Sequence, residues 1–354
     1  MKPQRERLIY LDAIRAVAAL SVVISHYIER TPLHQWAIFD FLRPGQFGVV
    51  VFFILSGFVI PFSFTKGATS NRTFLVSRLF RLYPAYWLSI LLACFAITHF
   101  LGADLNEKRI LANVTMLQAL TGYHNLFGVY WTLFVELVFY ALCIALSWAG
   151  LLGNLKIRLL MAITFLLAAL AGAAARHYLS LPAPVGILSS LSLMLFGGLW
   201  RSHVIDRTPK AKAYCLQWIA LFLLCFPLIA LLAYNVDQGL GENAYTYIGS
   251  YFTALLFFIT TTTLLKLKNK VLIFLGSISY SLYLIHPFFL EWVTARFSLS
   301  SQFNLAPFAL YLLVTLACST ACYVLIEKNG IRLGRRLNAA LDRAALKNAT
   351  PVRP

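Results

Sequence analysis

Residues 8–28, LIYLDAIRAVAALSVVISHYI, form an apolar run that is long enough to cross a lipid bilayer as a helix. The run nevertheless contains Asp12, Arg15 and His26. A charged side chain near the centre of a membrane helix costs at least about 2.5 kcal/mol, so such residues usually face a protein interior or a water-filled cavity. The stretch therefore predicts a membrane-spanning helix that contributes side chains to a functional site.

Arg15 and His26 are predicted to share one face of this helix. They are eleven residues apart, which at about 100° per residue returns to within roughly 20° of the same face, about 16 Å further along. Alternatively, Arg15 snorkels from a helix end and pairs with Asp12, while His26 lies at the opposite interface. A cleaved signal peptide is disfavoured because the apolar part of a signal peptide is short and uncharged.

The composition predicts an all-α polytopic membrane protein. Of the 354 residues, 60% are hydrophobic and only 12% are charged, and several apolar runs approach twenty residues. We expect about ten transmembrane helices, near residues 8–28, 47–64, 82–101, 126–148, 157–178, 184–200, 214–234, 246–266, 271–292 and 305–326.

The basic residues predict the orientation of these helices. With the N-terminus inside, the inner segments hold 23 lysines and arginines and the outer loops hold six. This bias satisfies the positive-inside rule with both termini cytoplasmic, in a cytoplasmic (inner) membrane. The net charge of +17 therefore reflects membrane topology, and no nucleic acid partner is expected.

One transmembrane domain, residues 1–327, is expected to be followed by a basic cytoplasmic tail, residues 328–354. The six cysteines lie within or beside apolar runs and are expected to be small buried apolar side chains. No metal site is expected, because none of them forms a metal-type pair with a nearby histidine.

Two further stretches contain residues suited to binding a donor molecule. In the second span, Ser56 and Gly57 allow close approach of a thin ligand, although ordinary helix packing explains them equally well. Arg78 and Arg81 are three residues apart and hence neighbours on a helix. Two guanidinium groups at the cytoplasmic interface form a phosphate site, and the alternative is a membrane anchor or a lipid headgroup site.

Two later spans contain isolated polar groups. Glu136 is the one carboxylate in its apolar run, and Tyr140 lies four residues away on the same face. Such a carboxylate is neutral, paired with a cation, or a functional base. Ser279, Tyr283 and His286 form a polar stripe that either lines a cavity or makes interhelical hydrogen bonds.

These parts are consistent with a group-transfer reaction. A cytoplasmic phosphate site, a deeper cation and a histidine near the outer face suit a long donor with an anionic head and a reactive far end, such as coenzyme A. His26 then acts as a general base on an acceptor hydroxyl or as a nucleophile that carries the acyl group.

The chain resembles the acyltransferase 3 family of integral membrane acyltransferases. The resemblance rests on LDAIRAVAALSVVISHY (11–27), FFILSGF (52–58), SRLFRLYPAYW (77–87), YWTLFVELVFY (130–140) and SISYSLYLIHP (277–287). It departs from the family pattern at Ala13, where many members have Gly, and at Asn329 and Gly330, near a common Pro.

The resemblance implies acyl-CoA-dependent O-acylation, commonly acetylation, of an extracytoplasmic sugar, polysaccharide or other hydroxylated acceptor. It implies that His26 is catalytic with Arg15 as its partner, that Arg78 and Arg81 bind the donor, and that Glu136 fills an acidic motif position. No permanently bound cofactor is expected, since acetyl-CoA or another acyl-CoA is the donor substrate. Other residues expected to line a cavity in the bilayer-embedded protein are Asp12, Tyr83, Trp131, Tyr140, Ser279, Tyr283 and His286.

Two questions stay open from the sequence. A secondary transporter or exporter also uses many spans with intramembrane Arg, Glu and His, although no internal repeat is evident between the two halves of the chain. The acyl group is either transferred by this chain alone or handed to a partner protein.

Overall fold

The computed structural model describes residues 8–64, 67, 69–235, 243–297, 299 and 303–349. Within these residues every regular element is a helix, which confirms the all-α fold class. The predicted inner cations Lys2, Arg5, Arg7, Lys66 and Arg353 lie outside them. The chain packs as two compact units, one comprising Met1–Pro61, Thr132–Tyr280 and Ser298–Leu305, the other Phe62–Trp131, Ser281–Phe297 and Ala306–Pro354.

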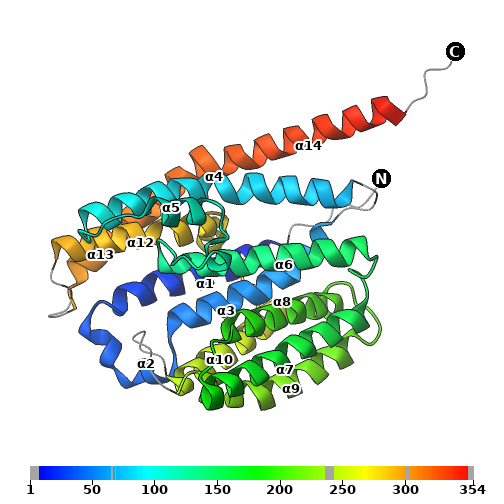
Figure 1. Ribbon diagram of the computed structural model, residues 1–354, viewed down its shortest axis with the longest axis horizontal. Coiled ribbons are helices and arrows are strands. Elements are labelled where there is room, and N and C mark those ends of the chain that lie inside the picture. The colour runs from blue at the N-terminus through cyan, green and yellow to red at the C-terminus, as the bar shows by residue number, and fades with distance from the viewer. Residues whose placement is uncertain are drawn as a thin grey trace. The chain divides into compact units, whose positions relative to one another are not determined.

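The first unit contains most of the long helices. They are α1 (Ile9–Ile28), α2 (Ala37–Phe41), α3 (Pro44–Val59), α6 (Trp131–Trp148), α7 (Leu155–Leu179), α8 (Val185–Val204), α9 (Ala211–Ala233), α10 (Ala244–Thr263) and α11 (Lys270–Ser277), with the short η1 (Pro32–Gln35). Helix α3 packs between α1 and α8, and α7 packs against both α8 and α9 (Figure 1).

The second unit contains α4 (Ser70–His99), α5 (Glu107–Val114), α12 (Ser279–Arg296), α13 (Leu305–Cys322) and α14 (Lys328–Ala349). Its short elements are η2 (Ile60–Ser63), η3 (Gln118–Leu120), η4 (Gly128–Tyr130) and the π-helical turn η5 (Tyr323–Glu327). In both units, helices begin where an asparagine side chain accepts backbone N–H groups of the first turn, as in α5, α7, α10 and α11.

Among the described residues, eight helical segments are long and apolar enough to cross a membrane, and a ninth results if α11 and α12 count as one bent span. The chain is therefore a multi-pass membrane protein. The predicted span at 246–266 corresponds to α10, which contains three tyrosines and six threonines and is thus less apolar than the others. The number ten stays a prediction.

One predicted span is not a continuous helix. We expected residues 271–292 to cross the membrane as one helix, but the helix breaks at Ile278 between α11 and α12. Gly276 explains the position of α11, because a Cβ atom at residue 276 would overlap the backbone carbonyl of Asp12. The eight-residue α11 is thus fixed against α1 by close backbone contact, which hydropathy alone does not reveal.

The predicted tail is helical over all its described residues. Helix α14 continues directly from η5 and lies antiparallel to the first turns of α4, and both helices belong to the second unit. Every fourth residue of α14 faces α4, namely Gly330, Gly334, Asn338 and Asp342. The polar stretch before residue 82, which lies outside the predicted span at 82–101, is therefore the first part of α4.

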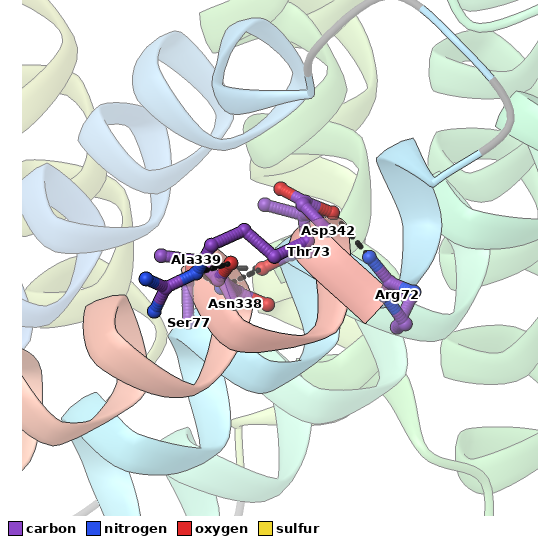
Figure 2. A network of polar contacts seen from close by, with 7 residues as sticks. Arg72, Thr73, Ser77, Asn338, Ala339 and Asp342 are labelled. Atoms are coloured by element: carbon purple, nitrogen blue, oxygen red, sulfur yellow. Dashed lines mark hydrogen bonds and ion pairs between the residues drawn. The ribbon is translucent and has the colours of Figure 1, made fainter. Parts of the chain in front are cut away.

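Polar contacts join α4 and α14 where the glycine contacts end (Figure 2). The Asn338 amide donates to the carbonyl oxygen of Thr73 and to Ser77 Oγ, both at 3.1 Å. Arg72 forms an ion pair with Asp342 one turn further along α14. The Asn338 side chain is buried, whereas both members of the ion pair are partly exposed.

The cysteines follow the prediction only in part. Four are buried, Cys94 is half-buried, and Cys318 is exposed on α13. We had expected all six to be buried, and the prediction was wrong for Cys318. An exposed side chain on an apolar spanning helix contacts lipid, which is as compatible with a small apolar residue as the protein interior.

Candidate active site

Helix α1 carries Arg15 and His26 in the relation that their spacing predicts. It runs without interruption from Ile9 to Ile28, so the two residues share a face about 16 Å apart along the axis. Arg15 Nη1 lies 2.9 Å from Asp12 Oδ1, and Asp12 is buried while the Arg15 side chain is 21% exposed. The pairing between Arg15 and Asp12, considered above as an alternative, is thus present in the structure.

His26 lies in the last turn of α1 and is half-buried. Next to it, Ser25 Oγ donates to Glu29 Oε1 at 2.9 Å. The charged groups that act electrostatically on the imidazole are Glu29, Arg30 and Arg43. We had not included these residues in the predicted site, although the two charges that directly follow the first span were a visible signal.

The residues at the start of α3 contact α10 and the end of α1 that carries His26. Arg43 immediately precedes α3, and its backbone N–H donates to Ser250 Oγ of α10 at 2.9 Å. Gly45 then packs beside Ser25, since a Cβ atom there would lie 3.1 Å from Ser25 Oγ. His26 is thus placed where α1, the start of α3 and the first half of α10 meet.

A polar cavity of about 610 Å³ lies at the same end of this unit. Its polar lining comes from Arg176, His177, Ser180 and Asn235, at the α7–α8 connection and the end of α9. The Arg176 guanidinium lies 5.8 Å from the ring centre of Tyr234, which stacks on Tyr247 at 3.8 Å. Tyr247 is one turn from Ser250 on α10, so α10 links this cavity to the surroundings of His26.

Gly57 serves helix packing. A Cβ atom at residue 57 would overlap the backbone carbonyl of Met194 in α8, and one at Gly197 would overlap the carbonyl of Ile54 in α3. The two glycines therefore let the α3 and α8 backbones touch, and the donor-binding role of Gly57 stays a prediction. Its neighbour Ser56 is half-buried and keeps its predicted role as a proposal.

Glu136 is part of a local polar pair in α6. The Tyr140 hydroxyl donates to Glu136 Oε1 at 2.6 Å, as expected for residues four apart on one face. Tyr140 is buried and Glu136 is half-buried, so the carboxylate does not point fully into lipid.

The two predicted donor-side arginines lie on α4, in the second unit. Arg78 donates to Ser63 Oγ at 3.0 Å, and its guanidinium lies 5.3 Å from the centre of the Phe74 ring. Phe74 in turn stacks on Phe64 at 4.1 Å. Arg81 is half-buried on the adjoining turn.

Other predicted cavity residues make structural hydrogen bonds within the second unit. The Tyr83 hydroxyl donates to the carbonyl of Thr115 at 2.9 Å, and the Tyr283 hydroxyl donates to that of Val129 at 3.2 Å. His286 Nδ1 lies 3.2 Å from the carbonyl oxygen of Leu282 on its own helix. Tyr283 and His286 are buried. The Tyr283 hydrogen bond is of the kind expected if the stripe joins neighbouring elements, and the cavity lining stays a prediction.

The division of the chain into units separates the predicted site residues. The first unit holds His26, Arg15, Asp12, Ser56, Gly57, Glu136, Tyr140 and Ser279; the second holds Arg78, Arg81, Tyr83, Trp131, Tyr283 and His286. Ser279 is the first residue of α12 and is buried, whereas Trp131 is exposed.

A buried carboxylate was missing from the predicted site. Glu327 ends the π-helical turn η5, is 2% exposed and accepts a hydrogen bond from Ser281 Oγ at 2.9 Å. Single π-helical turns are frequent at functional sites. The sequence signal was an acidic residue at the end of the last apolar run.

Parts of the chain are similar in sequence to known proteins. The chain is 30% identical over 155 residues to Nodulation protein 10 of Rhizobium leguminosarum bv. viciae, covering 36% of this chain and 41% of that protein. It is 37% identical over 106 residues to Protein 2 in the picA locus of Rhizobium radiobacter, covering 27% of this chain and 50% of that protein. It is 33% identical over 97 residues to an O-acetyl transferase of Shigella phage Sf6, covering 27% of each.

The chain thus spans half or less of the length of these relatives. No solved structure matches it. The sequence profile of the acyltransferase 3 family, described as an acyltransferase domain, matches residues 8–324, which include α1 with His26 and extend into η5. The chain therefore belongs to the acyltransferase 3 family.

Proposed function

We propose that this protein is a membrane O-acyltransferase that moves an acyl group, in particular acetyl, from cytoplasmic acyl-CoA to a hydroxyl of an extracytoplasmic sugar, polysaccharide or other hydroxylated acceptor. The observation that carries the proposal is the position of His26. It lies at one end of an uninterrupted membrane helix, on the same face as the Arg15–Asp12 pair, and it is surrounded by ionisable groups.

His26 performs the transfer by one of two balanced routes. As a general base, it takes the proton of the acceptor hydroxyl while the oxygen attacks the thioester carbonyl, and the departing thiolate receives that proton. As a nucleophile, the imidazole displaces the thiol to form an acyl-imidazole, which the acceptor oxygen then cleaves. Release of free thiol before any acceptor is added distinguishes the second route from the first.

The family supports acyl transfer, and the O-acetyl transferase among the relatives supports acetyl as the group transferred. The cavity lined by Arg176, His177, Ser180 and Asn235 supports a hydroxylated acceptor, because these groups offer donors and acceptors for hydroxyl recognition. We place it on the extracytoplasmic side, with ten spans and both termini cytoplasmic in the inner membrane. We propose no resident cofactor, and the acyl group passes either directly to the acceptor or to a partner protein that carries it there.

The test uses the full chain in nanodiscs and follows thiol release from acetyl-CoA with a panel of hydroxylated acceptors. We expect acceptor-dependent release in the unmodified protein and loss of at least a thousandfold in His26→Ala, since base or nucleophile is removed. His34→Ala is the matched control, because His34 lies in η1, shortly after α1, and its imidazole hydrogen-bonds with the Thr31 carbonyl. Equal turnover of His26→Ala and the unmodified protein would reject the proposal.

A secondary transporter is the second candidate, and the break between α11 and α12 favours it, since discontinuous helices form the sites of many transporters. Transport predicts uptake or export of a solute without cleavage of a thioester. Liposomes that accumulate a labelled acceptor in the absence of acyl-CoA would support the transporter instead of the enzyme.

A further inference from the structure

Glu327 is a buried carboxylate in the second unit, apart from the residues on α1 that we propose for acyl transfer. It ends the π-helical turn η5, is 2% exposed, and accepts a hydrogen bond from Ser281 Oγ at 2.9 Å. Among the side chains that the structure describes, one other carboxylate is buried, that of Asp12, and it pairs with Arg15. Burying a carboxylate is costly unless it is paired with a cation or protonated. A cation on a neighbouring element would offset this cost for Glu327.

Helix α4 is the element that packs against this part of the chain. Both η5 and α14 contact α4. A Cβ atom at Gly330 would lie 2.5 Å from the carbonyl oxygen of Phe80 and 3.0 Å from Pro84 Cγ, and Arg81 directly follows Phe80. Glu327 is three residues before Gly330, which corresponds to about 4.5 Å along the helix axis. Glu327 and Arg81 therefore lie within about one turn of each other along the pair of helices.

The other arginines at the start of α4 have different partners. Arg72 forms its ion pair with Asp342, towards the far end of α14 (Figure 2). Arg78 donates to Ser63 Oγ at 3.0 Å. Arg81 is half-buried, whereas the described lysine and arginine side chains of α14 are exposed. Arg81 is thus the cation whose level and burial best match the buried carboxylate.

A guanidinium group can hold a carboxylate and still bind a second anion. It is planar and has five N–H donors in a fixed geometry, so a carboxylate on one edge leaves the remaining donors for another partner. An arginine fixed in this way has lost much of its rotational freedom before a ligand arrives. It therefore loses less conformational entropy when the ligand binds, which increases the affinity.

We propose that Glu327 is a positioning residue whose carboxylate pairs with the Arg81 guanidinium and directs its remaining N–H groups towards the acyl-CoA donor. This inference rests on the proposed function, in which Arg81 contacts the donor. Ser281 at the start of α12 orients the carboxylate through its hydrogen bond. Glu327 itself does not touch the donor. The alternative is a protonated Glu327 that serves only to join η5 to α12.

The experiment is a double-mutant cycle on the full chain in nanodiscs of neutral phospholipid. Calorimetry measures the affinity for acetyl-CoA, which requires no acceptor. We expect Arg81→Gln to weaken binding at least tenfold and Glu327→Gln at least fivefold. The double variant should bind within twofold of Arg81→Gln, because the carboxylate has nothing to position once the arginine is absent.

Two further variants separate positioning from a structural effect. Asp342→Asn is the matched control, because Asp342 is an acid of α14 that pairs with a different arginine of α4. It should bind acetyl-CoA within twofold of the unmodified protein. Glu327→Asp keeps the charge on a shorter side chain and should bind within threefold of the unmodified protein. If Glu327→Gln does not fold, as thermal unfolding would show, Glu327→Asp takes its place in the cycle with Arg81→Gln, and its smaller loss should likewise disappear in the double variant.

The remaining outcomes reject one or both proposals. Unchanged acetyl-CoA affinity in Glu327→Gln would overturn the positioning role and leave the acyltransferase intact. Losses that multiply in the double variant would show that Glu327 and Arg81 act independently, and would also overturn it. Failure of the unmodified protein to bind acetyl-CoA at all would overturn the proposed function together with this inference.

Discussion

Ser56 and Gly57 of α3 differ in their role, because glycine has no side chain and allows another backbone to come close. Gly57 and Ser56 stand side by side on α3, in a motif that we first associated with donor binding. The structure commits Gly57 to backbone contact with Met194, whereas Ser56 is half-buried. The same sequence pattern thus contains a packing residue and a candidate binding residue.

Gly57→Ala is expected to lower stability by about 1–3 kcal/mol, because the added methyl group forces α3 away from α8. Ser56→Ala is the control and should change stability by less than about 0.5 kcal/mol. Thermal unfolding in detergent measures both. If Gly57→Ala unfolds like the unmodified protein while its acetyl-CoA affinity falls, the packing assignment is wrong.

Glu29 is expected to act as a positioning residue for the histidine. Both routes of acyl transfer develop positive charge on the imidazole, which the Glu29 carboxylate stabilises. Glu29→Gln keeps an acceptor for Ser25 but removes the charge, so turnover should fall roughly two- to fivefold with little change in the KM for acetyl-CoA. Arg30→Gln removes a cation from the next position and should not lower turnover; a decrease in both variants would indicate a structural effect.

At the scale of elements, the α4–α14 pair shows how a polar sequence becomes a packed helix. The stripe of Gly330, Gly334, Asn338 and Asp342 allows close approach and then adds polar contacts (Figure 2). The opposite face of α14 carries exposed Arg332, Arg335, Arg336 and Arg343. Tertiary contact stabilises this helix in addition to the propensity of its Ala, Leu and Arg residues.

The Asn338 hydrogen bonds and the Arg72–Asp342 ion pair should contribute differently to the free energy of unfolding. Asn338→Leu removes the amide group that donates to the Thr73 carbonyl and to Ser77 Oγ, and should destabilise the protein by about 0.5–1.5 kcal/mol. Arg72→Ala removes an ion pair that is 36% and 47% exposed, worth at most about 1 kcal/mol. Limited proteolysis after α13 and thermal unfolding report both; a larger effect for Arg72→Ala would contradict this ranking.

At the scale of the whole molecule, the distribution of cations leads to a prediction of orientation. Asp104 lies in a predicted outer loop and Lys268 in a predicted inner one, and both side chains are exposed. We expect Asp104→Cys to react with a membrane-impermeant maleimide in right-side-out vesicles, and Lys268→Cys to react only after permeabilisation. The unmodified chain measures background labelling of native cysteines, and the reverse pattern would reject cytoplasmic termini.

The sequence by itself determined the all-helical membrane class, the continuous first span with Arg15 and His26 on one face, and the family. These follow from local quantities, namely apolar length, charge content and a period of 3.6 residues, which every segment carries independently of its neighbours. Tertiary structure alone decided that Gly57 packs, that the helix breaks at Ile278, that α14 docks on α4, and that Glu327 is buried against Ser281. Each depends on the approach of residues far apart in the chain, and no local pattern records which backbone will fill the space beside a glycine or which side chains will be buried together.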